Sequence, residues 1–130
     1  KEKIIITLET DLPPEQFNNL LNKFNSPYIK ANYDIGNSIS NGFNPELELT
    51  ILKKHIFNIH IKDRIFQGNT VTLGKGDVNF DVFFRTLAKI NYEKDLIIQG
   101  AREDLEYTRV DPVKTCKKYL IFVKEYLSRS

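Results

Sequence analysis

The chain has 130 residues, with 19 basic and 17 acidic side chains, a formal net charge of +2 and 41% hydrophobic residues. This size and apolar content predict one globular domain over residues 1–130. The near balance of charge gives no basic stripe of the kind that nucleic-acid binding requires, so no nucleic-acid partner is expected.

Neither a membrane anchor nor secretion is expected. The apolar runs, such as Ile4–Ile6, are far shorter than the ~20 residues that span a bilayer. The start of the sequence lacks the long apolar segment of a signal peptide. Cys116 is the one cysteine and cannot form a disulfide within the chain, which fits a cytoplasmic location.

In the first half of the chain, two short β-branched or aromatic runs each precede a polar turn and a segment of helical period. A strand is predicted over Ile4–Leu8, and Pro13-Pro14 then opens a helix, since proline costs little in the first turn. A second strand is predicted over Tyr28–Tyr33, with Asn44-Pro45 as cap and first turn of the next helix. The inward positions are Phe17, Leu20, Leu21 and Phe24 in the first helix, and Leu49, Leu52 and Ile56 in the second.

The same pattern occurs twice more in the second half. The third strand is predicted over Phe57–Ile61, and a loop with three glycines leads to the third helix. The fourth strand is predicted over Leu96–Ile98, and Asp111-Pro112 opens the last helix. The inward positions are Phe80, Phe83, Phe84, Leu87 and Ile90 in the third helix, and Val113, Cys116, Leu120, Val123 and Leu127 in the fourth.

Strands that alternate with helices, without linkers between them, predict an α/β fold of βα units around a parallel sheet. Right-handed crossovers place all helices on one side of the sheet in a barrel, or on both sides in an open sheet. Four strands can form a small open sheet, and they are also half of the eight in a barrel. The pattern of elements leaves both architectures open.

One polar residue stands at the end of each predicted strand, where parallel βα proteins carry their sites: Glu9, Asp34, His60 and Gln99. The intervals of 25, 26 and 39 residues are each close to one βα unit of ~30 residues. One imidazole among carboxyl and amide oxygens suits Mn²⁺, Mg²⁺ or Co²⁺ better than Zn²⁺, whose sites are commonly rich in thiols. The alternative is that these residues are only helix caps and solvent-facing turns.

Other polar residues near the strand ends are weaker candidates. Lys62 and Arg64 follow His60 and could contact an anionic or hydroxyl-rich ligand, although basic residues in loops are usually only solvated. Arg102 follows Gln99 by three residues and could lie at the same rim. The run Gly74-Lys75-Gly76 lacks the length and spacing of a phosphate-binding loop.

Four stretches carry a resemblance when they are taken in order. They are Leu8-Glu9-Thr10, Tyr33-Asp34-Ile35-Gly36-Asn37, Ile59-His60-Ile61-Lys62-Asp63-Arg64 and Leu73-Gly74-Lys75-Gly76-Asp77-Val78-Asn79-Phe80. Together they resemble the sugar-phosphate isomerase/epimerase family, the xylose isomerase-like branch of TIM barrels that also holds ketose 3-epimerases. The resemblance covers essentially the whole chain, but it corresponds only to the fifth to eighth βα units of that fold.

The resemblance implies that Glu9, Asp34 and His60 bind a divalent metal, with a fourth ligand from the last strand. The ketose 3-epimerases carry a glutamate there that also acts as acid or base, whereas this chain has Gln99. An amide oxygen can bind a metal, but an amide cannot exchange a proton near neutral pH. This chain also has Asn37 where those epimerases often have a further histidine.

The resemblance implies a metal-dependent isomerase or epimerase that acts on a ketose or its phosphate through an enediolate. Glu9 would bind the metal and act as the base, Arg64 would hold a substrate oxygen, and Arg102 a phosphate or a distal hydroxyl. The substitution at Gln99 motivates an alternative, a non-catalytic sugar-binding or regulatory protein on the same scaffold. A third possibility is a small open-sheet domain of flavodoxin type that binds an anion at helix starts and does not bind Mn²⁺.

The length of the chain conflicts with a whole barrel, which needs ~250 residues and closes its sheet. We therefore expect a C-terminal half of a TIM (β/α)8 barrel, which forms a homo-oligomer or pairs with a missing N-terminal half. The sequence starts with Lys1 and contains no methionine, and we interpret this as a sign of truncation.

Overall fold

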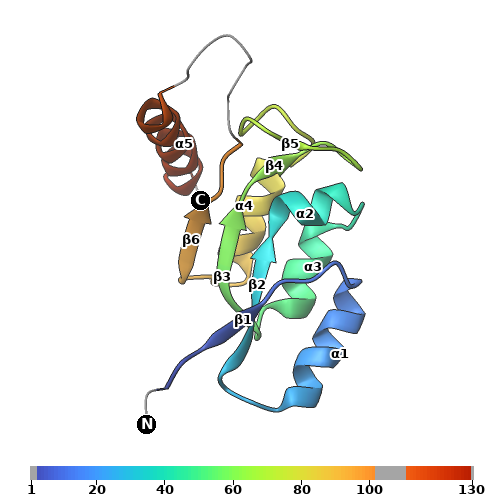
Figure 1. The fold of residues 1–130 in the computed structure, drawn as a ribbon. Helices are drawn as coiled ribbons and strands as arrows, with labels where there is room; N and C mark the ends of the chain where they lie inside the picture. The colour runs from blue at the N-terminus through green and yellow to red at the C-terminus, as the bar shows by residue number, and fades with distance from the viewer. Residues whose placement is uncertain (1–2, 102–110, 130) are drawn as a thin grey trace.

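The computed structural model describes residues 3–101 and 111–129, and its centre is a four-stranded parallel sheet (Figure 1). The strands lie side by side in the order β1-β2-β3-β6. Their bounds are Ile6–Leu8 for β1, Ile29–Asp34 for β2, Ile56–Ile61 for β3 and Asp95–Ile98 for β6. The four predicted strands are thus confirmed, with ends that differ by no more than two residues.

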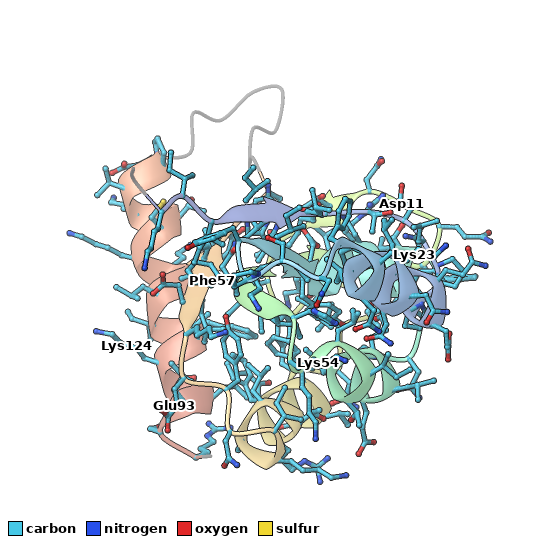
Figure 2. All side chains as sticks on the ribbon, turned by 90° about the horizontal axis from the view of Figure 1, so that it is seen from below. Asp11, Lys23, Lys54, Phe57, Glu93 and Lys124 are labelled. Carbon is cyan, nitrogen blue, oxygen red and sulfur yellow. The ribbon has the colours of Figure 1, made fainter. Side chains whose placement is uncertain are left out.

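Four helices follow the strands and pack against one another in chain order. They are α1 (Pro14–Phe24), α3 (Pro45–Leu52), α4 (Phe80–Lys89) and α5 (Pro112–Leu127). Seen from below, they form an arc around one side of the sheet, and Lys124 on α5 points away from it (Figure 2). This one-sided cover is the arrangement of a barrel and not of a doubly wound open sheet, so the flavodoxin-type possibility is wrong.

The first turns of the helices carry the proline and cap residues that the sequence predicts. Pro14, Pro45 and Pro112 each occupy the first turn of a helix. Asn44 Oδ1 accepts a hydrogen bond from Leu47 N at 3.2 Å, which satisfies one of the amide groups that a helix start leaves without a partner. Among the helices of residues 3–101 and 111–129, none has the length and apolar character that a membrane span requires.

The sheet has one apolar face and one face with polar residues near the carboxyl ends of the strands. Alternate residues of β2 and β3 pack under the helices and are buried: Ala31, Tyr33, Ile59 and Ile61. The residues between them point to the other face, because successive side chains of a strand alternate. These residues are Asn32, Asp34, Asn58 and His60, and the first two are also buried.

Three predicted details of helix packing are wrong. Phe24, at the end of α1, is 45% exposed and does not point inward. Ile56 lies in β3 and not on the inner face of α3. The buried face of α5 consists of Thr115, Tyr119 and Val123, whereas Cys116 is exposed and Val113, Leu120 and Leu127 are 60%, 45% and 48% exposed. The cause is aromatic packing, since Phe122 and Tyr126 lie against the rings of Phe80 and Phe84. The ring of Tyr119 also fills the space above Gly100, where a Cβ atom would lie 2.0 Å from it.

Short elements at the carboxyl end of the sheet were not predicted. Helix α2 (Ile35–Ser40) starts directly after β2 and is capped by the side chain of Asp34. Strands β4 (Asp63–Arg64) and β5 (Thr70–Val71) form a small antiparallel pair above β3 (Figure 1). Helix α2 packs against β3 and β4 at this end of the sheet.

The glycine-rich loop after β5 wraps around a buried carboxylate of the same chain. Asp63 is fully buried, and its two oxygens accept hydrogen bonds from the backbone N–H groups of Gly74, Gly76 and Val78 at 2.8, 2.9 and 3.2 Å. A Cβ atom on Gly76 would lie 2.2 Å from Asp63 Oδ1, so this position requires glycine. The run Gly74-Lys75-Gly76 is therefore a structural cradle for Asp63, a role that was not predicted.

Candidate metal centre

The carboxyl ends of β1, β2 and β3 bring three of the four predicted site residues together. Glu9 directly follows β1, Asp34 ends β2, and His60 lies opposite Asp34 in the register of the parallel pair. The register of this pair shifts by one residue between Ala31 and Asn32. One ligand atom from each of Glu9, Asp34 and His60 lies within 4.8 Å of the other two.

Asp34 is the most enclosed member of this cluster, with a side chain only 1% exposed. Its Oδ1 atom accepts a hydrogen bond from Asn37 N at 2.8 Å. Its Oδ2 atom forms an ion pair with Lys62 Nζ at 2.9 Å and lies 3.6 Å from His60 Nδ1. This buried acceptor, held close to a carboxylate and an imidazole, fits a divalent cation.

Glu9 is the more exposed carboxylate, with a side chain 37% exposed. Its Oε2 atom lies 3.4 Å from His60 Nδ1 and accepts a hydrogen bond from Asn32 Nδ2 at 2.5 Å. Its Oε1 atom accepts a hydrogen bond from Asn37 Nδ2 at 2.8 Å. Glu9 therefore combines access from solvent with a carboxylate that is held in a fixed orientation.

Arg64 and Lys62, the basic candidates on β4 and just before it, contact protein groups near this cluster. Arg64 donates hydrogen bonds from Nε and Nη2 to the carbonyl oxygen of Gly68, at 3.1 and 2.7 Å. Its Nη1 atom donates to Asn37 Oδ1 at 2.9 Å. Lys62 forms the ion pair with Asp34, so it neutralises a buried carboxylate.

The last strand places Gln99 further along the sheet than the other three residues. His60 lies opposite Ile97 in the β3–β6 pair, and Gln99 comes two residues after Ile97. The backbone N–H of Gln99 donates to the carbonyl oxygen of Ile61 at 2.9 Å. Arg102 lies outside the described residues.

A second acidic group lies behind the cluster. Glu48 on α3 is buried and accepts hydrogen bonds from the hydroxyl groups of Tyr33, at 3.1 Å, and Ser38. A narrow cavity is lined by Glu9, Asn37 and Glu48, so it joins this group to the cluster. Burial raises the pKa of Glu48 above 4.5, although the two hydroxyl groups oppose the shift.

This raised pKa predicts a specific dependence of stability on pH. The folded state binds the Glu48 proton more tightly than the unfolded state does, so the stabilisation is full below pH 4.5 and is lost as pH rises through the raised pKa. The variant Glu48→Gln is always neutral and is expected to lose less stability over that range. Urea unfolding at a series of pH values measures this, with exposed Glu46→Gln on the same helix as control. Parallel curves for wild type and Glu48→Gln would contradict the assignment.

The one-sided parallel sheet, with a carboxylate and histidine cluster at its carboxyl rim, defines a partial TIM barrel with a candidate metal centre. Comparison with known proteins agrees: the model of the xylose isomerase-like TIM barrel family matches residues 4–115. The chain belongs to this family. No match is found among curated proteins.

Solved structures of similar fold are about twice as long as this chain. A xylose isomerase domain protein from Planctomyces limnophilus is 27% identical with a TM-score of 0.80, and the match covers 96% of this chain and 47% of that one. An L-ribulose 3-epimerase is 20% identical with a TM-score of 0.74, covering 97% and 46%. The IOLI protein, solved with a zinc atom, is 20% identical with a TM-score of 0.73, covering 88% and 43%.

Proposed function

We propose that this protein is a metal-dependent isomerase or epimerase that acts on a ketose, or on its phosphate, through an enediolate intermediate. The observation that carries the proposal is the convergence of Glu9, Asp34 and His60, with the Asp34 carboxylate buried in the cluster. Structures of similar fold support a sugar substrate, since one of them is a D-allulose 3-epimerase in complex with D-allulose. We propose both the reaction on a sugar substrate and a cytoplasmic location for the protein.

The three side chains would hold Mn²⁺, Mg²⁺ or Co²⁺, because two carboxylates and one imidazole match the preference of these ions for oxygen and nitrogen ligands. When bound, such an ion would supply positive charge that stabilises negative charge on the substrate oxygens. Gln99 would offer an amide oxygen as a further ligand.

Glu9 is the best placed base for the proton transfer. It is exposed enough to reach a ligand, whereas Asp34 is enclosed and paired with Lys62. Gln99 cannot take part in proton transfer near neutral pH, so one carboxylate would remove the proton and return it to the adjacent carbon on the same face, which gives isomerisation; epimerisation would need a second acid on the opposite face. Arg64 and Arg102 would contact a substrate oxygen and a phosphate or distal hydroxyl, respectively.

Exchange of substrate hydrogen with deuterium tests this function. The full-length protein, loaded with Mn²⁺ or Co²⁺, is incubated in deuterium oxide with a panel of ketoses and ketose phosphates, and NMR follows deuterium at the carbons beside the carbonyl. We expect exchange or conversion of at least one sugar, a loss of about 10²-fold or more in Glu9→Gln, and no change in exposed Glu93→Gln. Full exchange in Glu9→Gln would overturn the role of Glu9.

A non-catalytic sugar-binding protein is the second candidate, and Gln99 at the place of a proton-transferring residue favours it. It predicts metal-dependent binding of a sugar, measured by calorimetry, without deuterium exchange in any of the sugars. An increase of measurable activity in Gln99→Glu would count against this candidate.

We also propose that the chain pairs with a second half barrel, either another copy or an N-terminal half. Among the described strands, β1 and β6 each have one neighbour, which leaves two sheet edges unpaired. Apolar side chains are exposed on α5 and β6, where Val113, Ile121 and Ile97 are 60%, 58% and 44% exposed. A monomeric mass by light scattering, combined with full stability of residues 1–130 alone, would contradict pairing.

A further inference from the structure

We propose that two carboxamides, Asn32 and Asn37, position the Glu9 carboxylate. Asn58 orients Asn32, and Arg64 orients Asn37, each by donating a hydrogen bond to the carboxamide oxygen. This inference rests on the proposed function, because it concerns the same candidate metal centre. The residues involved lie on β2, β3, β4 and α2, and two of them, Asn32 and Asn58, were not singled out by sequence motifs.

The first carboxamide, Asn32, lies on β2 two residues before Asp34, so both side chains share one face of the sheet. It is buried, at 7% exposed. Its Oδ1 atom accepts a hydrogen bond from Asn58 Nδ2 at 2.5 Å. An amide has its oxygen and its NH₂ group at opposite ends, so this bond turns the NH₂ group of Asn32 toward the cluster. That group lies 2.5 Å from Glu9 Oε2 and 3.2 Å from His60 Nδ1.

The second carboxamide, Asn37, lies on α2 and contacts the other oxygen of Glu9. Its Nδ2 atom donates to Glu9 Oε1 at 2.8 Å, and its Oδ1 atom accepts from Arg64 Nη1 at 2.9 Å. Arg64 is anchored in turn by two hydrogen bonds to the carbonyl oxygen of Gly68. The guanidinium can only donate, so it fixes the orientation of Asn37 as Asn58 fixes that of Asn32.

The two hydrogen-bonded pairs, Asn58–Asn32 and Arg64–Asn37, contact different oxygens of the Glu9 carboxylate. Each oxygen of Glu9 receives an N–H group, which fixes the plane of the carboxylate. Groups that orient metal ligands in this way commonly affect metal affinity although they do not touch the ion. Asn58 and Arg64 are therefore positioning residues that act through Asn32 and Asn37.

A double-mutant cycle tests whether Asn58 acts through Asn32. Calorimetry measures Co²⁺ affinity of the full-length protein and of the variants Asn32→Leu, Asn58→Leu and the double variant, with Asn19→Leu on the exposed face of α1 as control. We expect affinity to fall roughly 10–100-fold in Asn32→Leu, to fall in Asn58→Leu as well, and to fall no further in the double variant. Unchanged affinity in Asn58→Leu, or additive losses, would overturn the inference.

The wild-type protein supplies a second measurement that needs no variant and no metal. The side-chain NH₂ groups of Asn32 and Asn37 each donate to Glu9, whereas Asn19 is exposed and serves as an internal reference. The side-chain amide ¹H signals of Asn32 and Asn37 are expected downfield of those of Asn19, because each group donates a hydrogen bond to a carboxylate. Signals of Asn32 and Asn37 at the positions of Asn19 would overturn the arrangement. If wild type binds no Co²⁺, the proposed function fails, and these signals still decide the inference.

Discussion

Replacement of Asp34 by asparagine is expected to reduce the affinity for Co²⁺ or Mn²⁺ by about 100-fold or more and to abolish metal-dependent turnover. The amide keeps an oxygen that can accept the hydrogen bond from Asn37 N, so the start of α2 remains capped. It removes the negative charge that faces His60 and Lys62. Lys62, only 12% exposed, would then lie beside the cluster without its acidic partner and repel a cation.

Two further variants separate the loss of a ligand from the loss of an ion pair. Lys62→Met also breaks the ion pair, but it leaves the Asp34 carboxylate in place, and it is expected to retain binding of Co²⁺. Asp95→Asn changes an exposed carboxyl at the opposite end of the sheet and is expected to have no effect. Calorimetric titration with Co²⁺ measures the metal affinity of the three variants Asp34→Asn, Lys62→Met and Asp95→Asn. An equal loss of affinity in Asp34→Asn and Lys62→Met would mean that the ion pair, and not a metal ligand, explains the role of Asp34.

Replacement of Asp63 by alanine is expected to destabilise the fold strongly, because this β4 residue holds the glycine-rich loop. The carboxylate is fully buried and accepts three backbone hydrogen bonds, from Gly74, Gly76 and Val78. Each donor left without an acceptor costs about 1–3 kcal/mol, so the total loss is expected to be about 3 kcal/mol or more. Urea unfolding measures this loss.

The variant Asp63→Asn is the matched comparison, since it keeps one acceptor oxygen and the same shape. Its stability is expected to lie between those of wild type and Asp63→Ala. Lys75→Ala, at an exposed position between the two glycines of the cradle, is expected to unfold like wild type. If Asp63→Ala unfolds at the same urea concentration as Lys75→Ala, the loop does not depend on the buried carboxylate.

The order of the elements and the three clustered residues could be predicted because both depend on local patterns. A run such as Phe57–Ile61 has the composition of a strand, and the residues at the carboxyl ends of parallel strands meet at one rim. Glu9, Asp34 and His60 were selected by that rule, and the structure brings them together.

The remaining features depend on contacts between distant segments. The buried face of α5 includes Thr115 and Tyr119, because the space beside Gly100 and the rings on α4 decides the rotation of the helix. The roles of Asn32 and Asn58 depend on the register of β2 and β3, which shifts between Ala31 and Asn32. Asn32 could have been selected from the sequence, because it lies two residues before the ligand candidate Asp34 and therefore on the same face of the strand.

Paramagnetic broadening by Mn²⁺ tests the central claim most directly. The chain has two histidines, with His60 in the cluster and His55 hydrogen-bonded to Asn22 at the other end of β3. If Glu9, Asp34 and His60 bind a divalent ion, substoichiometric Mn²⁺ will broaden the ring signals of His60 and leave those of His55 sharp. Equal broadening of both rings, or none at His60 with excess Mn²⁺, would contradict a metal centre at this rim.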